Sequence, residues 1–559
     1  MLGMMQQRPL LLSSLIEHAD RYHGDRAIVS RLADGTMHRS NYRAVAERAR
    51  RIGNVLGHLG VRHGDRVATL AWNSYRHLEL YFGVTGTGAV LHTVNPRLFV
   101  EQIHYIIDHA EDRYVFFDLT FAALVEQLAP KLSHVEGWIA LCRRDELPGS
   151  HSTSRMGPVP SLSVDNLLCY EDLLAAESGE YAWPSFDENT ASTLCYTSGT
   201  TGNPKGVLYS HRSQMLHTFV AMAADVMAVS ARDSIMLVVP LFHANAWGLP
   251  FAAAATGAKL VLPGMRLDPE SVYTLIRDET CTLAAGIPTI WLNLFTWIEQ
   301  NRDRLNLADI KLTRVLSGGT AVPRSTIEKF QTLFGTYLLQ AWGMTETSPI
   351  ATAGALLDKH ADLSLERRYD LQALQGRSVI GCEVRLVDDA GNELAHDGRT
   401  VGELQVRGPW VIAGYFKGEG GQVLDKDGWF RTGDVATITP DGYVQLTDRA
   451  KDLVKSGGEW ISSVEIENLA VGHPAVHEAA VIAARHPTWQ ERPLLLIHPK
   501  PGESVSKQEM LDYLADKIAK WWLPDDVVIV DELPHTATGK LLKTKLREEY
   551  GGWLERKAG

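Results

Sequence analysis

The sequence has few cysteines, and none of them are spaced as structural pairs. Five cysteines are scattered over 559 residues without a Cys-x-x-Cys motif. An odd, dispersed set of this kind predicts neither a disulfide framework nor a structural zinc site, and it is typical of a reducing compartment. We therefore expect a cytoplasmic protein.

Long apolar runs and an excess of basic residues are also lacking. No run approaches the roughly 18 uninterrupted apolar residues that a membrane-spanning helix needs. The apolar stretch 9–16 leads directly into Glu17 and His18, which favours the start of an amphipathic helix over a signal peptide. A formal net charge of −12 argues against the basic footprint of non-specific nucleic-acid binding. We expect no membrane span and no nucleic-acid partner.

A chain of 559 residues is too long for one hydrophobic core, so more than one domain is expected. Over its middle part, strand-like and helix-like segments alternate, a pattern that predicts helix-covered, mostly parallel sheets. Asp268 and Pro269 have the residue types of a helix N-cap and first turn. The predicted strands are 235–239, 259–262, 282–287 and 314–316, and the predicted helices are 244–256, 268–279, 288–300 and 323–334.

The C-terminal part of the chain has a different pattern. Short alternating strands at 383–387, 402–407 and 443–447, separated by Gly-containing turns, predict antiparallel β structure. A compact α+β segment follows, with strands 479–483, 494–497 and 527–530 and a helix 507–521. We expect an α/β fold with a large domain over 1–448, closed by a small β-barrel-like subdomain, and a small α+β domain over 449–559. Residues 147–160 are expected to form a surface loop.

The segment TSGTTGNPKG at 197–206 carries the strongest chemical signal. A run of Gly, Ser and Thr can surround anionic oxygens with backbone N–H groups and hydroxyls, and Lys205 adds a positive charge for phosphates. The spacing is not that of a Walker A loop. A flexible linker is the alternative, but the flanking strand-like runs favour a positioned phosphate loop. Its candidate residues are Thr197, Ser198, Gly199, Thr200, Thr201, Gly202 and Lys205.

Two further motifs follow predicted strands. Ser317–Thr320 contains a glycine pair, which alone indicates only a turn. In QAWGMTETSP at 340–349, Trp342 offers a flat face for a base and Thr345 a hydroxyl. Glu346 offers a carboxylate that, with phosphate oxygens, suits Mg²⁺. For a single glutamate, a solvated surface charge is the alternative.

The remaining candidates lie toward the C-terminus. Asp434 in RTGDVA and Arg449 in TDRAKD could hold a ribose and a phosphate, although salt-bridged turns would explain both. KSGGEWIS at 455–462 contains Lys455, Gly457, Gly458 and Trp460. Lys540 follows a Gly-containing turn in PHTATGKLLK, where a solvated charge is again the alternative.

These motifs occur in an order and spacing that resemble the acyl-adenylate-forming superfamily, which includes acyl-CoA synthetases, carrier-loading adenylation domains and beetle luciferases. The resemblance extends from GDRVA at 64–68 to Lys540. PLFHANAW at 240–247 and KDLVKSGGEWISSVE at 451–465 look most like bacterial fatty-acyl-CoA ligases, with ligases for 3-methylmercaptopropionate also similar. Two positions depart from the pattern: Trp342 stands where many members have Tyr, so it lacks a phenolic oxygen, and Asp448 stands where Gly is common.

The resemblance implies a two-step reaction in which a carboxylate and ATP form acyl-AMP, and the thiol of CoA then releases AMP. It implies phosphate contacts for Thr197–Lys205 and an α-phosphate contact for Thr345. Thr197 and Glu346 would hold Mg²⁺, and Lys540 would bridge the carboxylate and α-phosphate. Nucleotide contacts are implied for Gly318, Gly319, Thr320, Gln340, Ala341, Trp342, Gly343, Asp434 and Arg449.

The resemblance also implies that the small domain is mobile, with Lys451 at its hinge. Rotation would bring Gly457 and Gly458 to the pantetheine channel, with Lys455 and Trp460 nearby. His243 would lie near the reacting carboxylate, and Trp247 resembles a residue that gates the acyl tunnel. For both, an ordinary core position is the alternative. Relatives of this kind are often homodimers.

The acid itself is left open by the sequence. We expect a medium- or long-chain fatty acid, with short substituted acids such as 3-methylmercaptopropionate, or aryl acids, as alternatives. A carrier protein could replace CoA as the acceptor, although the absence of a fused carrier domain favours CoA. A luciferase-like oxygenase and a non-catalytic nucleotide-binding protein are the other classes, and the filled functional positions argue against the latter.

Overall fold

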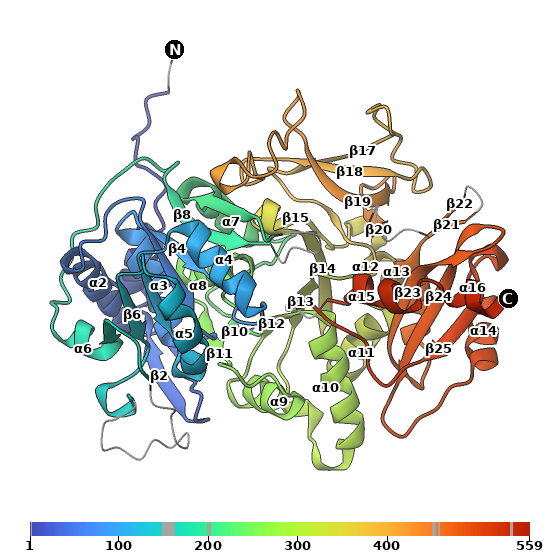
Figure 1. The fold of residues 1–559 in the computed structure, drawn as a ribbon, viewed down its shortest axis with the longest axis horizontal. Coiled ribbons are helices and arrows are strands. Elements are labelled where there is room, and N and C mark those ends of the chain that lie inside the picture. Colours follow the sequence, from blue (N-terminus) through green and yellow to red (C-terminus); the bar gives the residue numbers. More distant parts are fainter. Residues whose placement is uncertain are drawn as a thin grey trace. The chain divides into compact units, whose positions relative to one another are not determined.

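The computed structural model describes residues 1, 3–147, 162–197, 203–449, 454–456, 459–536 and 540–558 (Figure 1). The chain divides into two units. Unit 1 consists of Met1–Ala285 with two short later segments, Met344–Pro349 and Ile412–Gln422. Unit 2 consists of Gly286–Gly343, Ile350–Val411 and Val423–Gly559.

Unit 1 contains a seven-stranded sheet whose order is β7-β6-β5-β3-β4-β8-β9. All neighbouring strands are parallel except β8 and β9, which form an antiparallel pair around the 197–205 segment. Their bounds are β3 Arg66–Leu70, β4 Val90–Thr93, β5 Tyr114–Phe117, β6 Gly137–Ala140, β7 Leu167–Cys169, β8 Ala191–Tyr196 and β9 Gly206–Ser210.

A second group of strands in unit 1 pairs in the order β12-β10-β11-β1-β2, with only β1 and β2 antiparallel. These strands are β1 Ala27–Arg31, β2 Met37–Asn41, β10 Ser234–Leu237, β11 Lys259–Leu262 and β12 Leu283–Gly286. The helices of the unit are α1 Ser13–His23, α2 Tyr42–His58, α3 Tyr75–Gly86, α4 Val100–Ala110, α5 Ala122–Leu128, α6 Tyr170–Ala175, α7 His211–Ala221, α8 Leu249–Thr256 and α9 Pro269–Asp278.

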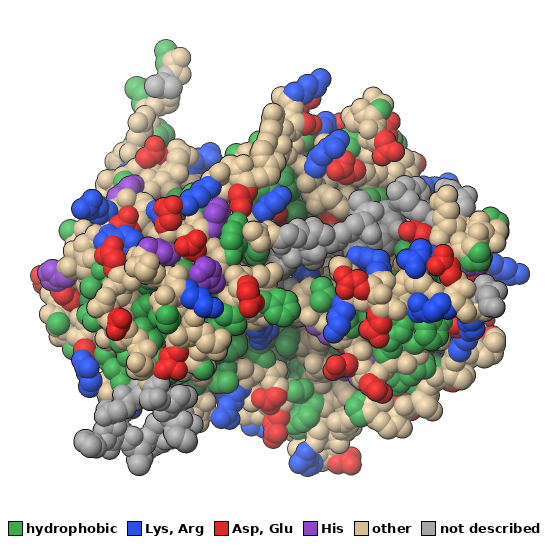
Figure 2. All heavy atoms as spheres, in the orientation of Figure 1, with side chains coloured by type: hydrophobic (Ala, Val, Ile, Leu, Met, Phe, Trp, Pro, Cys, Tyr) green, Lys and Arg blue, Asp and Glu red, His purple; other side chains and the backbone are tan. Residues whose placement is uncertain are grey.

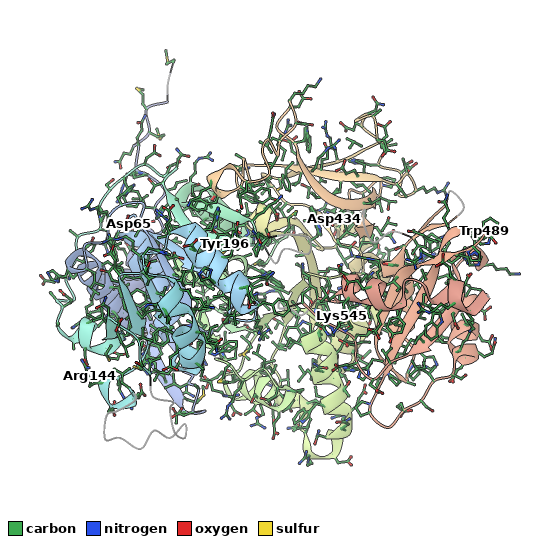
Figure 3. The ribbon with its side chains drawn as sticks, in the orientation of Figure 1. Asp65, Arg144, Tyr196, Asp434, Trp489 and Lys545 are labelled. Atoms are coloured by element: carbon green, nitrogen blue, oxygen red, sulfur yellow. The ribbon has the colours of Figure 1, made fainter. Side chains whose placement is uncertain are left out.

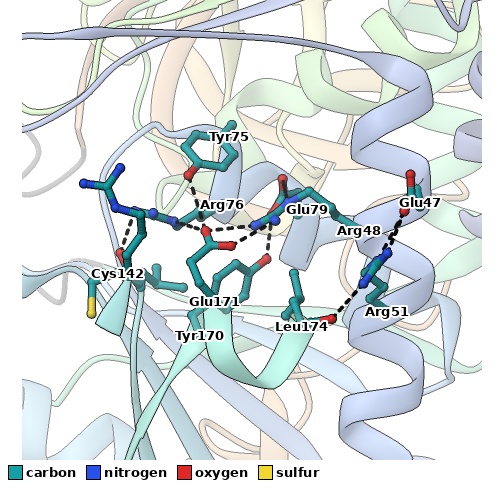
Figure 4. Close-up of polar contacts among 12 residues, drawn as sticks. Glu47, Arg48, Arg51, Tyr75, Arg76, Glu79, Cys142, Tyr170, Glu171 and Leu174 are labelled. Atoms are coloured by element: carbon teal, nitrogen blue, oxygen red, sulfur yellow. Dashed lines mark hydrogen bonds and ion pairs between the residues drawn. The ribbon is translucent and has the colours of Figure 1, made fainter. Parts of the chain in front are cut away.

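A buried polar network ties α2, α3 and α6 together (Figure 4). Glu79 on α3 has no solvent exposure and accepts from Arg48 on α2 at 2.7 Å and from the Tyr170 hydroxyl at 2.6 Å. Arg48 also donates to both carboxylate oxygens of Glu171, which accepts a further bond from Arg76. Because a buried charge left without its partner costs about 3–5 kcal/mol, this network fixes the helices that cover the sheet.

The first strands that lie wholly in unit 2 are the parallel pair β13 and β14, to which β15 and β16 add in antiparallel fashion. A separate four-stranded antiparallel sheet follows in the order β17-β18-β19-β20. The bounds are β13 Arg314–Gly318, β14 Tyr337–Gly343, β15 Ile350–Ala353, β16 Arg377–Ser378, β17 Glu383–Val387, β18 Gly402–Arg407, β19 Phe430–Ile438 and β20 Val444–Arg449, with helices α10 Pro288–Gln300, α11 Arg324–Phe334 and α12 Leu365–Gln372.

The last part of unit 2 is an α+β segment built around the long antiparallel pair β23 and β24, with β25 parallel to β24. Apolar clusters line both faces of this pair, with Val481 and Leu495 in one cluster and Ile482 and Leu494 in the other. The elements are β21 Val454–Ser456, β22 Glu459–Ile461, β23 Val476–His486, β24 Gln490–Pro499, β25 Asp526–Ile529, α13 Ser463–Val471, α14 Lys507–Ala515, α15 Lys543–Tyr550 and α16 Trp553–Ala558.

The predicted α/β fold is confirmed: helix-covered, mostly parallel sheets are followed by an antiparallel sheet and a small α+β part. The predicted cap is present, since the Asp268 carboxylate accepts from the Ser271 N–H at the start of α9. Within the described part of the chain, no helix has the length and apolarity to cross a bilayer. Figure 2 shows acidic and basic side chains interspersed over the visible face.

Two predicted helices are wrong in extent. The helix predicted over 244–256 begins only at Leu249, because Ala244–Gly248 turn in the opposite sense. The helix predicted over 507–521 ends at Ala515, before a short 3₁₀ turn at Lys520–Trp522. The loop predicted at 147–160 lies outside the described residues apart from Leu147, and the division at 448/449 stays a prediction.

Candidate functional site

The neck of the predicted phosphate loop is fixed by two hydrogen bonds between its ends. The Thr197 N–H donates to the Lys205 carbonyl at 2.9 Å, and the Lys205 N–H donates to the Thr197 hydroxyl at 3.1 Å. Both residues continue the antiparallel β8–β9 pair. The loop is therefore held at its base as predicted, while Ser198, Gly199, Thr200, Thr201 and Gly202 lie outside the described residues.

In unit 1, Glu346 and Lys205 contact the same tyrosine. The Tyr415 hydroxyl donates to Glu346 Oε1 at 2.7 Å, and the Lys205 ammonium lies 4.9 Å from the centre of the Tyr415 ring. Glu346 is only 7% exposed, so it is not a solvated surface charge. The Tyr209 hydroxyl donates to the Thr345 carbonyl at 2.7 Å and anchors the same short turn. Burial raises the pKa of both tyrosines well above the ordinary value.

Glu346 and Thr197 carry oxygen donors of the kind that a hard divalent cation prefers. Glu346 contributes a buried carboxylate and Thr197 a hydroxyl, and Mg²⁺ prefers one or two such ligands together with phosphate oxygens and waters. The described residues contain no cluster of three or more His, Cys, Asp or Glu that could hold a metal by themselves. The donor set therefore fits Mg²⁺ brought in with a nucleotide.

Unit 2 joins two predicted nucleotide-binding residues directly. The indole N–H of Trp342 on β14 donates to Asp434 Oδ2 on β19 at 2.9 Å (Figure 3 labels Asp434). Trp342 and Asp434 are 6% and 4% exposed. The indole thus makes a polar contact although it lacks the phenolic oxygen that many relatives have. In the β19–β20 pair Asp434 is opposite Arg449, of which only the backbone is described.

The predicted glycine pair lies at the end of β13, close to Lys540. Gly319 has φ = +84°, a left-handed conformation that favours glycine. A Cβ at this position would lie 3.9 Å from the Lys540 side-chain carbon Cε and 3.6 Å from Ile287 Cγ2. Lys540 is half-buried. Lys540 and the Gly318–Gly319 turn, which are far apart in sequence, are thus neighbours.

The strands behind this turn present buried polar atoms. Gln340 on β14 is 1% exposed, and its side-chain oxygen accepts from the Val322 N–H at 3.2 Å. The Gln340 amide nitrogen and the Ser317 hydroxyl are buried and have no hydrogen-bond partner among the residues that the structure describes. Ser317 and Gly318 are opposite Gln340 and Ala341 in the β13–β14 register. Unsatisfied groups of this kind suit the edge of a heterocyclic base.

The segment that carries Lys540 is closed by its own hydrogen bonds. The Thr536 N–H donates to the Lys540 carbonyl at 2.6 Å, and the Lys540 N–H donates to the Thr536 hydroxyl at 3.1 Å. Next to it, His535 Nε2 lies 3.2 Å from Glu478 Oε1 on β23. The hydrogen bond to Glu478 raises the pKa of His535 above its ordinary value. This ion pair anchors the base of the lysine segment.

The His535–Glu478 pair predicts a pH-dependent contribution to stability. Because the folded pKa of His535 is raised, the stabilisation is fully present below the unfolded value of about 6.5 and is lost as the pH rises through the folded value. Glu478→Gln should therefore lower the thermal midpoint more near pH 6 than near pH 8.5. The Glu478 charge also acts on His477 and His498, so the pH-dependent loss includes their contribution. Glu509→Gln, which removes the carboxylate that pairs with His473, is the matched control. An equal loss at both pH values would contradict the role of the ion pair.

Trp342→Phe tests the contact with Asp434. The phenyl ring keeps an aromatic face but removes the indole N–H, so the carboxylate loses the group that orients it. Because a hydrogen bond to a charged group contributes about 1.5–3 kcal/mol, we expect the KM for ATP to rise about 10- to 100-fold. Trp410→Phe, which removes an indole bond to the Ile350 carbonyl, is the control. ATP titrations of the two variants should differ, and equal KM values would count against the contact.

The segment Ala244–Gly248 forms a left-handed turn in place of the predicted helix start. Its φ values are +43°, +53°, +47°, +59° and +74°, and only the last residue is glycine. Each non-glycine residue in this conformation costs about 1–2 kcal/mol. The turn follows His243, which is half-buried, and it includes Trp247, which is 7% exposed. A locally unfavourable backbone that persists among buried residues indicates that neighbouring contacts determine it.

The remaining predicted residues are described only in part. Lys451, Gly457 and Gly458 lie outside the described residues, and Lys455 and Trp460 are described only as backbone of β21 and β22. Thr320 lies two residues after the end of β13, and Gly343 is the last residue of β14. The sequence reasoning missed Tyr415, Tyr209 and the His535–Glu478 pair. Tyr415 lies in the Gly-rich stretch GYFKGEGG at 414–421, which was not recognised as a motif, and only its aromatic ring among glycines could have drawn attention to it.

Comparisons with known proteins match almost the whole chain. Residues 15–416 match the model of the AMP-binding enzyme family, and residues 465–540 match that of the AMP-binding enzyme C-terminal domain. The 3-methylmercaptopropionyl-CoA ligase of Ruegeria lacuscaerulensis is 50% identical over 550 residues, which cover 98% of this chain and 99% of that protein. The medium-chain-fatty-acid–CoA ligase of Ectopseudomonas oleovorans is 48% identical over 556 residues, 100% of this chain and 99% of that protein.

Among solved structures, the fold is similar to that of the anthranilate CoA ligase AuaEII in complex with anthranoyl-AMP. The TM-score is 0.84 at 23% sequence identity, and the alignment covers 99% of this chain and 100% of that one. The resemblance that the motifs predicted is confirmed by the family models and by the two relatives.

Proposed function

The chain belongs to the AMP-binding enzyme family, and from this membership we propose that it is an AMP-forming acyl-CoA ligase. It would convert a carboxylic acid, ATP and CoA into acyl-CoA, AMP and pyrophosphate, through an acyl-AMP intermediate. The observation that carries the proposal is the placement of Lys540 beside the Gly318–Gly319 turn, within the same unit as the Trp342–Asp434 pair.

The first half-reaction needs mainly positioning and charge stabilisation. The 197–205 loop would hold the β- and γ-phosphates, with Lys205 as its cation, and Thr345 would contact the α-phosphate. Glu346 and Thr197 would hold Mg²⁺, which would supply positive charge to the phosphate oxygens. Lys540 would donate to the carboxylate and to an α-phosphate oxygen, which lowers the repulsion as these anions approach.

The nucleoside would be bound by unit 2. Asp434, oriented by Trp342, would accept from the ribose hydroxyls, with Arg449 beside it. The buried amide of Gln340 would meet the edge of the base, together with Gly318, Gly319, Thr320, Ala341 and Gly343. In the second half-reaction, rotation at Lys451 would withdraw Lys540 and bring Gly457, Gly458, Lys455 and Trp460 to the pantetheine arm of CoA.

For the acid, we propose a medium- or long-chain fatty acid, with 3-methylmercaptopropionate-like or aryl acids as the alternative. The two relatives at 48% and 50% identity are named for acids of different size, so the family alone does not choose between them. A pyrophosphate-release screen over carboxylic acids from three to eighteen carbons, with and without CoA, tests the proposal. Release that peaks with short sulfur-containing acids would favour the alternative, and no release with any acid would overturn the activity.

Trp247→Ala tests the proposed acyl gate. Removing the indole should widen the acid site, and a change of one methylene in a pocket is worth about 1–3 kcal/mol. We expect the ratio of kcat/KM between the best long and the best short acid to change about tenfold. Trp138→Ala on β6 removes an equally buried indole from a core cluster, so it should lower stability without changing that ratio. An unchanged chain-length profile in Trp247→Ala would indicate that Trp247 is an ordinary core residue.

The acceptor, the compartment and the assembly are further parts of the proposal. A thioester product with free CoA distinguishes the ligase from an enzyme that loads a carrier protein, and oxygen consumption would reveal an oxygenase. All five cysteines are buried free thiols, which supports a reducing, cytoplasmic location. Light scattering after size-exclusion chromatography tests the expected homodimer.

A further inference from the structure

The left-handed turn Ala244–Gly248 is tied to the sheet through one side chain, that of Asn245. Asn245 has no solvent exposure. Its amide nitrogen donates to the Thr193 hydroxyl at 2.9 Å. Its amide oxygen accepts from the Tyr81 hydroxyl at 3.3 Å and from the Cys195 thiol at 3.7 Å. Burial raises the pKa of Cys195 to about 11, so this group remains a protonated donor.

The chain that leads into the turn is held in a similar way. The Asn73 side chain donates to the carbonyls of Leu237 and Val239, both at 2.8 Å, and accepts from the Leu241 N–H at 2.7 Å. The Tyr81 hydroxyl has one proton and shares it between the Asn245 amide oxygen and the Leu241 carbonyl, which lies closer, at 2.5 Å. Side chains from outside the segment therefore determine its path on both sides of His243.

Asparagine suits the position for two reasons. Among residues with a side chain, it tolerates the left-handed region well, which matters at φ = +53°. Its amide carries both a donor and an acceptor, so it can bond Thr193 on one side and Tyr81 on the other. Aspartate would keep the acceptor but lose the donor, and glycine would keep the backbone freedom but lose both bonds.

Thr193 and Cys195 are on β8, the strand that leads directly into Thr197 and the phosphate loop. The same strand therefore anchors the turn that contains Trp247 and directly follows His243. We propose that Asn245 is a positioning residue for the acid substrate: it holds the left-handed turn against β8, so that the acid-binding residues keep a fixed place relative to the phosphate loop. This inference rests on the proposed ligase function.

Thr193→Val and Asn245→Ala test the inference. Losing a buried hydrogen bond of this kind should raise the KM for the acid about tenfold, while the KM for ATP stays within about twofold, because the neck of the phosphate loop is bonded independently of Asn245. Asn245→Gly should still allow the left-handed backbone but removes the side-chain hydrogen bonds. It should therefore resemble Asn245→Ala in the KM for the acid. Combining Thr193→Val with Asn245→Ala should add little to the effect of Asn245→Ala, because that variant already removes the bond to Thr193.

Thr69→Val is the matched control. Thr69 is a fully buried threonine on β3 of the same sheet, and its hydroxyl bonds the His77 ring at 3.0 Å without contacting the turn. It should lower the thermal midpoint and leave the KM for the acid unchanged. If Thr193→Val and Asn245→Ala only lower the midpoint as this control does, or raise the KM for ATP as much as that for the acid, the positioning role is wrong.

A second measurement separates this inference from the proposed activity. In protein labelled with fluorotryptophan, the ¹⁹F resonance of Trp247 is identified as the one missing from Trp247→Phe. Thr193→Val should shift or broaden this resonance, and Thr69→Val should leave it in place. An unmoved resonance in Thr193→Val overturns the inference whatever the substrate. If the wild type releases no pyrophosphate with any acid, the ligase proposal fails. The Trp247 resonance would still show whether the Asn245–Thr193 hydrogen bond holds the turn in place.

Discussion

Lys540→Ala is expected to slow acyl-AMP formation about 10²–10³-fold, which is the usual loss when one preorganised charge-stabilising group is removed. The Lys540 side chain lies beside the Gly319 turn, and we propose that its ammonium binds the oxygens of the adenylate. Thioester formation from supplied acyl-AMP should stay within a few-fold of the wild type, because the carboxylate is already activated. Pyrophosphate release measures the first half-reaction, and acyl-CoA formed from synthetic acyl-AMP measures the second.

Lys545→Ala is the control for this variant. Lys545 is an exposed lysine on α15, close to Lys540 in sequence (Figure 3 labels it), and its loss removes the same charge from the same domain. Both half-reactions should then proceed at about the wild-type rate. Equal losses of the two half-reactions in Lys540→Ala would mean that the lysine supports the fold or CoA binding and has no specific part in adenylation.

Glu346→Gln is expected to have the second-largest effect, a loss of about 10²-fold in the rate of adenylation. Glutamine keeps the shape of the side chain and can still accept from the Tyr415 hydroxyl, but it removes the negative charge proposed to bind Mg²⁺. The Mg²⁺ concentration needed for half-maximal rate should rise, and excess Mg²⁺ should restore part of the activity. Initial rates measured over a Mg²⁺ titration would reveal both changes.

Two further variants make the Glu346 result specific. Tyr415→Phe keeps the carboxylate and the ring beside Lys205 but removes the hydrogen bond, so it should cost only about tenfold. Glu136→Gln alters a glutamate that also accepts from a tyrosine hydroxyl, that of Tyr114, and should leave the Mg²⁺ titration unchanged. If Glu346→Gln slows the reaction without changing the Mg²⁺ requirement, the carboxylate has another role.

Local patterns predicted much of the fold. Asp268 followed by Pro269 identified the start of α9, and apolar patterns identified β8–β13, β17, β18, β20 and β23–β25, whereas none of β1–β7 was predicted. These features depend on neighbours in sequence, so a single chain contains the information. The helix predicted from 244 failed for the opposite reason: side chains distant in sequence, those of Asn73, Tyr81 and Thr193, hold residues 244–248 in another path. Only the two alanines among these five residues are good helix formers, so the local preference for a helix is weak.

The sequence predicted which residues belong to the candidate site better than it predicted which of them contact each other. The motifs identified Trp342 and Asp434 separately, but nothing in the sequence indicated that they bond each other across 92 residues. Tyr415 was missed for the same reason, since its partner Glu346 is 69 positions away. Such pairs depend on how strands are placed side by side, which motif reading does not provide.

Unit 1 is built from three separate chain segments, and this limits how chimeric enzymes could be made from this chain. The QAWGMTETSP motif is split, with Trp342 assigned to unit 2 and Glu346 to the short Met344–Pro349 segment of unit 1. Tyr415 belongs to unit 1 through Ile412–Gln422. A graft that exchanges residues 1–285 as a single block would separate Lys205 from Tyr415, which it contacts, and from Glu346, to which Tyr415 is bonded. Recombination with a relative should therefore transfer the three segments together.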